Sequence, residues 1–437
     1  MAGVGCFLFY SKSVKFPAHA IRLASAIAIA SSLTLTSMSA VEAVAPTVKV
    51  TSMRPTLFAG QSVTLKGSVS RSLRGKTVRI DYLSDTGWKK LASTKSNSKG
   101  AWKAKIHVPV SVTSFQVRAV VGKKKSAVQS STVLPGAEIV AAGPGNRILG
   151  VDISRWQHSS GHLINFAKMA TAGTAFVIMK ASDGSSGEDA LARSYVLADA
   201  QGVLDAGMIR GYYHMAKLPT PVVGATPEQT SKAITDSAIA QAHTAADRLA
   251  ELGGYDGRTL PYVLDIEGVS SSITDASISL WTTTWYSTML ELTQRKPMIY
   301  SYRSFMQDRF TLSDPTTLTT LQSMHLWMAQ PGDPADPAVV VGQKSYQSGT
   351  CYATAWTKPG CNLLWTFWQY TNTGDRELFG IPWKPASGQS CPADATMCFS
   401  NAGSARLHLD VDVFSGTAGD LNALLTGNWD RSPADFQ

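Results

Sequence analysis

The chain has 437 residues, of which 44% are hydrophobic and 16% are charged. This composition excludes an intrinsically disordered chain, and the length allows two or three folded domains. The net charge of +9 is unevenly distributed, because residues 46–145 carry 17 Lys and Arg against three acids, whereas residues 146–437 carry 20 against 27. We therefore expect a basic domain with a net charge of +14, joined to an acidic main domain with a net charge of −7.

The first 45 residues predict a secretory signal peptide. Lys12, Lys15 and Arg22 precede a small and apolar run from Leu23 to about Thr36, and small residues near position 45 offer a cleavage site. An uncleaved membrane anchor is the alternative, but Ser and Thr dilute the run, which is short for a membrane span. We therefore expect a secreted, extracellular or cell-wall-associated protein with no stable membrane span after cleavage.

Cysteine usage agrees with export. Cys6 leaves with the signal peptide, and the remaining four cysteines are Cys351, Cys361, Cys391 and Cys398. Four cysteines allow three connectivities, and the short intervening loops favour the pairs 351–361 and 391–398. A zinc site is the alternative, but no CxxC spacing or paired His supports it, so we expect no metal and no cofactor.

Residues 46–134 alternate apolar and polar side chains in short runs that Gly, Asn, Ser and Pro separate. Six to eight strands in about ninety residues predict an antiparallel β-sandwich, immunoglobulin-like in type and without an inter-sheet disulfide. Residues 135–147 predict a linker by composition. We expect strands at 48–50, 62–66, 77–82, 102–106 and 114–118.

From residue 148 to residue 428 short apolar strands alternate, early on, with helical segments, and residues 429–437 form a C-terminal tail. Strand–helix alternation predicts a parallel sheet, and eight strands predict an irregular α/β barrel whose closing part leaves little room for helices. The expected strands are 150–152, 176–180, 209–214, 261–267, 298–301, 325–329, 364–370 and 407–412. The expected helices are 164–172, 189–206, 228–251 and 277–293.

Catalytic groups gather at the C-terminal ends of the strands in such a barrel. Here these ends carry mainly acids and aromatic residues, which suit a sugar chain and not a phosphate, because CH faces stack on rings and hydroxyls need acceptors. The residues at the strand ends are Asp152, Lys180, Asp183, His214, Asp265, Glu267, Tyr300, Trp327, Gln330, Trp368, Gln369, Asp410 and Asp412.

The most informative stretch is an apolar run that ends in Asp265-Ile266-Glu267. Alternation along a strand points both carboxylates the same way, about 6.6 Å apart along the backbone. Two such acids do not ionise independently, so we expect one pKa to rise and the other to fall, which supplies a proton donor and an anion. The alternative interpretation is a strand that leaves the core and meets water with two solvated acids.

Six segments, in this order along the chain, resemble glycoside hydrolase family 25, the Chalaropsis-type lysozymes or N-acetylmuramidases. The resemblance covers about residues 148–425 and implies cleavage of the β-1,4 bond between N-acetylmuramic acid and N-acetylglucosamine. Asp183 stands where the family more often has Glu, and Asp412 where Asn is common. The segments are GVDISRWQ (150–157), KASDG (180–184), GYYH (211–214), LPYVLDIE (260–267), WQYT (368–371) and DVDVF (410–414).

By this resemblance Glu267 matches the general acid and Asp265 its partner carboxylate, while Asp152 and Asp410 match the acids on the first and last strands. Asp265 is expected to be ionised, and either to stabilise the reacting centre or to orient the substrate's acetamido group. We further expect substrate contacts from acids, amides and aromatic platforms, although large aromatics on strands are more often core packing. These residues are Asp183, Tyr213, Tyr300, Trp327, Gln330, Trp368 and Gln369.

For two further residues at the strand ends we expect structural roles. His214 is expected to be a core histidine with its hydrogen bonds satisfied, and Lys180 is expected to pair with one of the acids.

The implied partners are peptidoglycan glycan strands, with anionic cell-wall polymers for the basic domain and no nucleic acid. A chitinase-like glycosidase would share the Asp-x-Glu arrangement, but we would expect further acids upstream on that strand. A zinc amidase or cysteine peptidase would need motifs such as HExxH that the chain lacks. A non-catalytic wall-binding protein is disfavoured because all the acids remain.

Overall fold

The computed structural model describes residues 46–109, 112–134, 139–184, 190–310, 314–332, 354–358 and 363–429. The predicted signal peptide, the predicted pair of Cys351 and Cys361, and residues 430–437 of the predicted tail lie outside the described residues. Within the described ranges, none of the helices combines the length and the apolar character needed to cross a bilayer.

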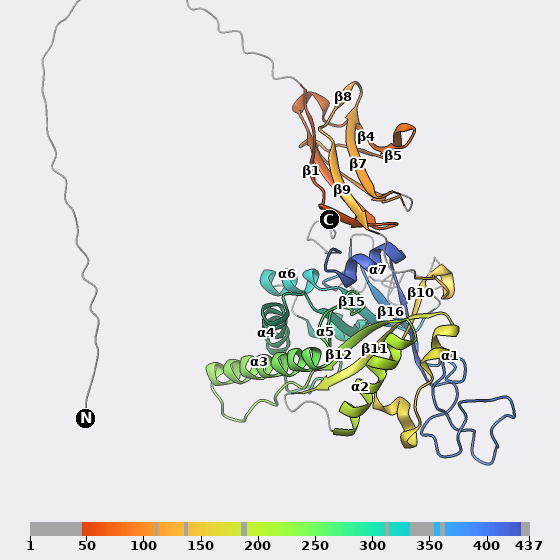
Figure 1. The fold of residues 1–437 in the computed structure, drawn as a ribbon. Coiled ribbons are helices and arrows are strands. Elements are labelled where there is room, and N and C mark those ends of the chain that lie inside the picture. The colour runs from red at the N-terminus through yellow and green to blue at the C-terminus, as the bar shows by residue number, and fades with distance from the viewer. Residues whose placement is uncertain are drawn as a thin grey trace, which may run out of the picture. The chain divides into compact units, whose positions relative to one another are not determined.

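Residues 46–134 form two β-sheets whose inward side chains, such as Leu65, Trp102 and Phe115, share one hydrophobic core. The strand order is β1-β3-β6 in one sheet and β2-β9-β7-β4-β5 in the other, with β8 beside β7 (Figure 1). Only β2 and β9 pair in parallel. The five predicted strands are confirmed as β1, β3, β4, β6 and β7, and β2, β5, β8 and β9 are additions. The immunoglobulin-like type stays a prediction. The strands are β1 (Val48–Ser52), β2 (Thr56–Phe58), β3 (Ser62–Val69), β4 (Thr77–Ser84), β5 (Gly87–Lys95), β6 (Ala101–His107), β7 (Ser114–Val121), β8 (Lys124–Lys125) and β9 (Gln129–Leu134).

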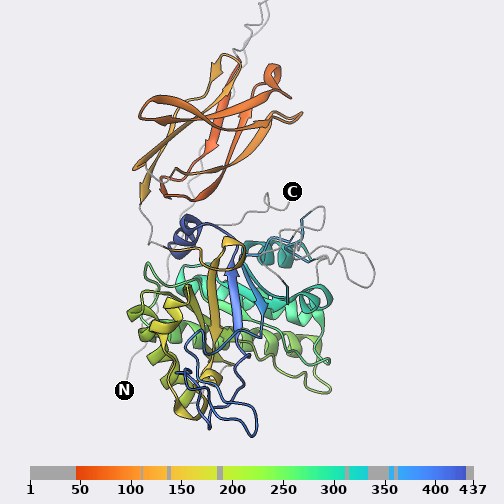
Figure 2. The same ribbon diagram turned by 90° about the vertical axis from the view of Figure 1, so that its right-hand side faces the viewer.

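The second set of strands closes into an eight-stranded barrel in chain order (Figures 1 and 2). All eight predicted strands are present. The predicted parallel sheet is wrong for β17, which runs antiparallel to both β10 and β16, because the chain re-enters the barrel at the rim where β16 ends. The strands are β10 (Ile148–Ile153), β11 (Thr174–Asp183), β12 (Ile209–Met215), β13 (Val263–Asp265), β14 (Met298–Tyr302), β15 (Leu326–Ala329), β16 (Phe367–Thr371) and β17 (Asp410–Phe414).

Helices cover the outside of the barrel, where α3 and α4 lie side by side (Figures 1 and 2). The long helix α3 begins at a capping box, in which Thr226 and Gln229 bond each other's backbone N–H. The four predicted helices correspond to α1–α4, whereas α5–α7 were not predicted. The helices are η1 (Arg71–Leu73), η2 (Pro144–Asn146), η3 (Arg155–Gly161), α1 (Phe166–Thr171), α2 (Ala190–Asp205), α3 (Pro227–Glu251), α4 (Asp275–Thr293), α5 (Arg303–Arg309), α6 (Pro315–Ser323) and α7 (Ala418–Leu425).

The barrel interior is apolar at one end and acidic at the other. Phe176, Met298, Phe367 and Phe414 belong to one buried cluster inside the barrel. A Cβ at Gly150 would lie 2.1 Å from the Phe176 ring, so glycine at this position lets the ring fill the barrel. Since side chains alternate along each strand, the residues two positions beyond this apolar layer also point inward, at the opposite end of the barrel.

Candidate active site

The strand register brings the predicted acids together at one rim of the barrel. Asp152 on β10 lies opposite Asp410 on β17, and Gln369 on β16 lies opposite Asp412. Because β17 is antiparallel, Asp410 begins its strand at the rim where the parallel strands end. Asp410 therefore lies among the strand ends as predicted, but it begins its strand, whereas it was predicted near the end of one.

Asp265 ends β13, and the next two residues continue its direction. The Ile266 N–H donates to the Tyr300 carbonyl oxygen at 3.1 Å, and the Ser301 hydroxyl donates to the Ile266 carbonyl oxygen at 2.7 Å. These bonds fix Ile266, so Glu267 keeps the inward direction of Asp265. Asp265 is 5% exposed, and its Oδ1 has no hydrogen-bond partner among the described residues.

Burial and mutual repulsion hold protons on this cluster of carboxyl groups. Burial, and then the charge of Glu267, raise the pKa of Asp265 well above its ordinary value. Burial, and then the charge of Asp410, raise the pKa of Glu267, while Lys180 opposes the rise. The prediction that one pKa rises and the other falls is therefore wrong, because both carboxyl groups are desolvated.

Burial also raises the pKa values of the neighbouring acids. Burial raises the pKa of Asp152 well above its ordinary value, and the charges of Asp410 and Asp412 add to the rise. Burial also raises the pKa of Asp412 to about 8, against a 2.7 Å hydrogen bond from Trp327 Nε1. Burial therefore raises the pKa of every carboxyl group of this rim that has been described, including Asp410. In the described part of the chain, no group of three or more His, Cys, Asp or Glu is placed to hold a metal ion.

An amide and a phenol connect this rim through hydrogen bonds. Gln369 Nε2 donates to Asp152 Oδ2 at 2.7 Å, and the Tyr300 hydroxyl donates to Gln369 Oε1 at 3.1 Å. Each side chain comes from a different strand, so the chain of bonds fixes Asp152 relative to β14 and β16. Gln369 and Tyr300 were predicted as substrate contacts, and here they also orient an acid.

Asp183 is held by two lysines. Lys180 Nζ donates to its Oδ2 at 2.7 Å, and Lys217 Nζ lies 2.5 Å from its Oδ1. Burial alone would raise the pKa of Asp183, but these two bonds lower it below its ordinary value. The predicted pairing of Lys180 with an acid is confirmed. Lys217 was missed, although it follows a predicted strand by only a few residues.

His214 lies outside the cluster of acids. It is fully buried and bonds Ser182 at 2.8 Å and Gln241 at 3.0 Å. Burial lowers its pKa to about 4, so the ring is neutral at most pH values. The interpretation of His214 as a core histidine with satisfied hydrogen bonds is confirmed.

The aromatic residues divide between the two faces of the barrel wall. Trp327 faces the interior, where its ring centroid lies 4.4 Å from that of Tyr300 and 6.2 Å from that of Tyr213, which is half-buried. Trp368 neighbours Gln369 and so faces the opposite way, into the core between the barrel and its helices. Both tryptophans are 1% exposed. The structure therefore does not place the Trp368 ring among the acids, which corrects its predicted role as a sugar platform.

Glu267 opens into a hollow of about 300 Å³ beside α5. Tyr302, Asp308 and Arg309 also line this hollow, and the sequence analysis did not single them out. Tyr302 is 39% exposed and directly follows the predicted strand 298–301. The half-buried Glu267 thus reaches a hollow, whereas Asp265 is buried.

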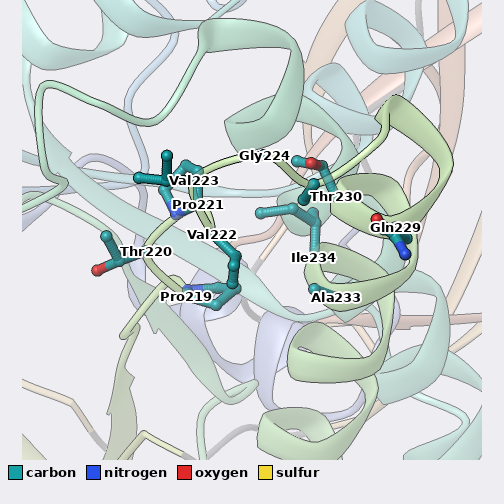
Figure 3. Close-up of a pocket in the computed structure, with 11 residues that line it drawn as sticks. Pro219, Thr220, Pro221, Val222, Val223, Gly224, Gln229, Thr230, Ala233 and Ile234 are labelled. Atoms are coloured by element: carbon teal, nitrogen blue, oxygen red, sulfur yellow. The ribbon is translucent and has the colours of Figure 1, made fainter.

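A second hollow, of about 430 Å³, lies between residues 219–225 and the first turns of α3 (Figure 3). Its lining is mainly apolar, with Val222, Val223 and Ile234 directed into or around it. None of the acids described above lines it.

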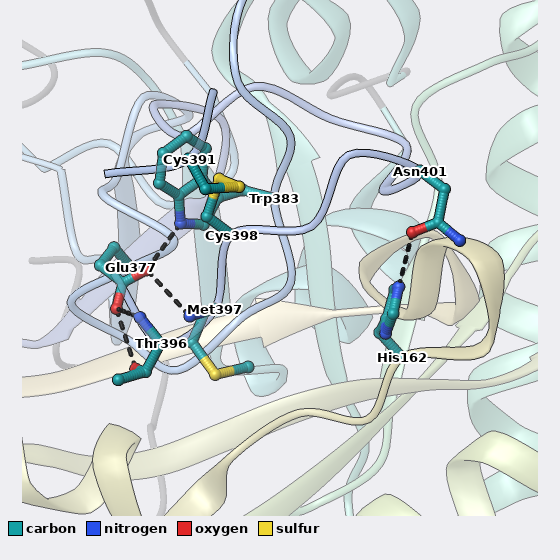
Figure 4. Close-up of a disulfide and its surroundings, with 8 residues drawn as sticks. All are labelled: His162, Glu377, Trp383, Cys391, Thr396, Met397, Cys398 and Asn401. Atoms are coloured by element: carbon teal, nitrogen blue, oxygen red, sulfur yellow. Dashed lines mark hydrogen bonds between the residues drawn. A yellow bond between two sulfur atoms is a disulfide. The ribbon is translucent and has the colours of Figure 1, made fainter. Parts of the chain in front are cut away.

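The segment between β16 and β17 carries a disulfide that joins Cys391 to Cys398, which confirms one predicted pair (Figure 4). The carboxylate of Glu377 accepts hydrogen bonds from Trp383 Nε1 at 2.8 Å and from the N–H groups of Thr396 and Met397. It also accepts a bond from Lys168 on α1. The insertion is therefore anchored to the barrel, and in Figure 1 it lies beside α1.

The sequence is similar to those of several known proteins. A sequence model of glycosyl hydrolases family 25 matches residues 151–377. The chain is 28% identical to Lysozyme M1 of Streptomyces globisporus over 252 residues, which cover 54% of this chain and 68% of that protein. It is 32% identical to the N,O-diacetylmuramidase of Chalaropsis sp over 165 residues, which cover 36% of this chain and 67% of that protein.

Solved structures add two similar chains. A muramidase from Acremonium alcalophilum is 24% identical, and the match covers 64% of this chain and 100% of that one with a TM-score of 0.38. A family GH25 lysozyme from Aspergillus fumigatus is 21% identical, with 64% and 98% covered and a TM-score of 0.37.

Proposed function

We propose that this chain, which belongs to glycosyl hydrolases family 25 and is a glycoside hydrolase of the lysozyme type, cleaves peptidoglycan with Glu267 as its general acid. The bond cleaved is the β-1,4 bond between N-acetylmuramic acid and N-acetylglucosamine. One observation carries the proposal. A carboxyl open to a hollow stands two residues from a buried carboxyl, and both keep protons above their ordinary pKa values.

The reaction needs a proton for the leaving oxygen and stabilisation of positive charge at C1. Asp265 and Glu267 hold one proton between them, which rests on the buried Asp265 while the site is empty. With substrate bound, the proton lies on Glu267, which delivers it to the glycosidic oxygen as the C1–O bond breaks. The unpartnered Oδ1 of Asp265 then accepts a hydrogen bond from the substrate's acetamido N–H.

The acetamido oxygen forms a bond to C1 in the same step, so the leaving sugar departs without a protein-bound intermediate. Water next attacks C1 and gives its proton to Glu267, while the bond between C1 and the acetamido oxygen breaks. This step restores the acid and the acetamido group and retains the configuration at C1. Asp152 and Asp410 act as hydrogen-bonding acids that position Asp265, water and sugar. Substrate contacts are assigned to Asp183, Tyr213, Tyr300, Gln330 and Gln369. Trp327, which is 1% exposed, supports Tyr213 and Tyr300 from beneath.

The remaining assignments concern the whole chain. We propose that residues 1–45 direct secretion, that 46–134 form an immunoglobulin-like sandwich, that 135–147 link the domains and that 148–428 form the catalytic barrel. The protein then acts outside the cell or at the cell wall.

We also propose that the basic domain tethers the enzyme to anionic cell-wall polymers. On the outward face of the β1-β3-β6 sheet, Lys66 and Lys103 lie directly opposite each other in register, and Lys49 and Lys105 lie on the same face. Like charges opposite each other on neighbouring strands destabilise a sheet, so a polyanion that bridges them would bind with a favourable free energy.

The tether is tested with the chain that lacks residues 1–45, in pelleting assays with purified sacculi. Replacing Lys49, Lys66, Lys103 and Lys105 with Gln should weaken binding at about 50 mM salt, where screening is modest. The matched control replaces Lys76, Lys89, Lys90 and Lys95, which are exposed and belong to the other sheet or precede it. Equal loss in both variants would reject this face, and binding that does not depend on salt would reject the tether.

A chitinase-like activity is the competing function, and product analysis separates the two. Wild-type protein should release new reducing ends from purified peptidoglycan, and mass spectrometry after borohydride reduction should find muramitol at those ends. Glu267→Gln should release none, whereas Glu291→Gln, exposed on α4, should behave as wild type. Glucosaminitol ends, or equal release by Glu267→Gln, would contradict the proposal.

A further inference from the structure

Trp156 is the only exposed tryptophan of the chain, and the proposed mechanism gives it no role. All eleven tryptophans lie in the described residues, and the other ten are buried or half-buried. Trp156 is 67% exposed, and among the exposed large hydrophobic residues of the described ranges only Tyr302 is also aromatic. Tryptophan is highly buried on average, so an exposure of this size needs a reason.

The turn that carries Trp156 is fixed directly after the strand that carries Asp152. Trp156 lies on η3, which begins two residues after β10 ends. The buried Gln157 side chain accepts hydrogen bonds from the Ser154 N–H at 2.7 Å and from the Ser154 hydroxyl at 3.2 Å. The Gln157 N–H donates to the Ser154 carbonyl oxygen at 3.1 Å. These three bonds close a tight turn around Trp156.

A buried histidine fixes the same turn to helix α2. His158 Nε2 lies 2.8 Å from Asp199 Oδ2, and its ring stacks on the Tyr195 ring with the centroids 4.1 Å apart. The indole itself is supported, because the Arg155 guanidinium lies 4.6 Å from the centroid of the Trp156 ring, within the range of a cation–π contact. A ring that is held before binding loses little conformational entropy when a ligand stacks on it.

Trp156 and Tyr302 belong to opposite sides of the barrel mouth. β10 and β14 are four positions apart in the closed order of eight strands. Trp156 follows β10 by three residues and Tyr302 ends β14, so both lie at the rim that carries the acids. A strand spacing of about 4.8 Å and a tilt of about 36° give such a barrel a backbone diameter of about 15 Å. Tyr302 shares a hollow with Glu267, whereas Trp156 does not line it.

We propose that Trp156 is an outer sugar-binding platform. A glycan strand that crosses the mouth stacks the CH face of a sugar ring on the indole, several sugars away from the cleaved bond. The neighbours of Trp156 in the chain, Arg155 and Gln157, are polar, and a single ring in a polar surround suits a sugar better than a broad apolar partner. This inference rests on the proposed glycan substrate, and it adds a preference for long strands over short oligosaccharides.

The test measures kcat and KM on peptide-free glycan of two lengths, long strands and the tetrasaccharide, which has only two sugars on each side of the cleaved bond. Trp156→Ala should raise KM for long strands about three- to tenfold and leave kcat unchanged, because stacking is equal in the ground and transition states. KM for the tetrasaccharide should not change. Trp156→Tyr keeps a ring and should restore most of the affinity. Leu292→Ala, exposed on α4, is the matched control and should change neither substrate.

An unchanged KM for long strands in Trp156→Ala would overturn the inference. An equal rise in KM on both substrates, a fall in kcat alone, or no recovery in Trp156→Tyr would overturn it as well, because each would mean a role other than distant stacking. If the wild type cleaves only long strands, the inhibition constant of the tetrasaccharide takes the place of its KM. A wild type that cleaves neither substrate would instead reject the proposed function on which the inference rests.

Discussion

Glu377 offers a quantitative test of how the insertion between β16 and β17 is held. Its carboxylate accepts hydrogen bonds from Lys168, Trp383, Thr396 and Met397, and its side chain is 12% exposed (Figure 4). Burial alone would raise its pKa, but these bonds lower it from 4.5 to about 2. After a discount for solvent screening, a shift of this size corresponds to about 2 to 3 kcal/mol of stability at neutral pH.

The sign follows from the depressed pKa. The contribution of Glu377 is fully present above pH 4.5 and is lost as the pH falls towards 2. Glu377→Gln removes the charge and turns one acceptor into a donor, so the amides of Thr396 and Met397 should lose protection against hydrogen exchange. The expected loss is roughly hundredfold at pH 7, and it should shrink steadily below pH 4.5.

The assay is hydrogen–deuterium exchange with mass spectrometry of peptides that span residues 391–400, corrected for the intrinsic rate at each pH. Glu291→Gln is the matched control and should leave the exchange of these peptides unchanged. In Glu377→Gln itself, the exchange of peptides from α3 should also stay unchanged. Loss of protection by the same factor at pH 3 and pH 7 would refute the reasoning, because the effect would then not depend on the charge of Glu377.

Three further predictions concern the site and its supports. Gln369→Leu removes the hydrogen bond that lowers the pKa of Asp152. The kcat/KM should fall roughly ten- to hundredfold, with little change in melting temperature. An unchanged kcat/KM would mean that the Gln369 amide does not orient Asp152. The disulfide stabilises the insertion because it restricts the unfolded chain, so replacing Cys391 and Cys398 with Ser should lower the local stability by about 2 kcal/mol. Proteolysis between the two positions should become faster, and an equal rate would contradict this effect. NMR of the first-formed product should show the β-anomer if the acetamido group takes part, whereas the α-anomer would replace that step by direct attack of water.

Much of the barrel could be predicted because its strands are short apolar runs that end in polar residues. The run before Asp265 and Glu267 identified both the strand and the rim. The resemblance to family 25 is confirmed by the family match over residues 151–377, which includes five of the six segments apart from Gly150. The direction of β17 could not be predicted in this way, because local patterns do not encode which neighbour a strand pairs with or in which direction.

The errors at the site have specific physical causes. The faces of Trp368 and Gln369 follow from simple alternation along β16, so the signal that separates them was present in the sequence. The raised pKa of Asp265 depends on burial and on neighbouring acids from other strands, which only the folded chain brings together. Trp156 was not predicted as a substrate contact, because it lies beyond the end of the predicted strand 150–152 and its exposure follows only from the folded chain.

The most direct test of the central claim compares Glu267→Gln with wild type on two leaving groups of the same glycan. Cleavage of peptidoglycan needs a proton from the acid, so its kcat/KM should fall roughly a thousandfold. Release of dinitrophenolate from the matching aryl glycoside needs no proton and should fall less than about tenfold. An equal fall on both substrates, or no fall on peptidoglycan, would contradict the assignment of Glu267 as the proton donor.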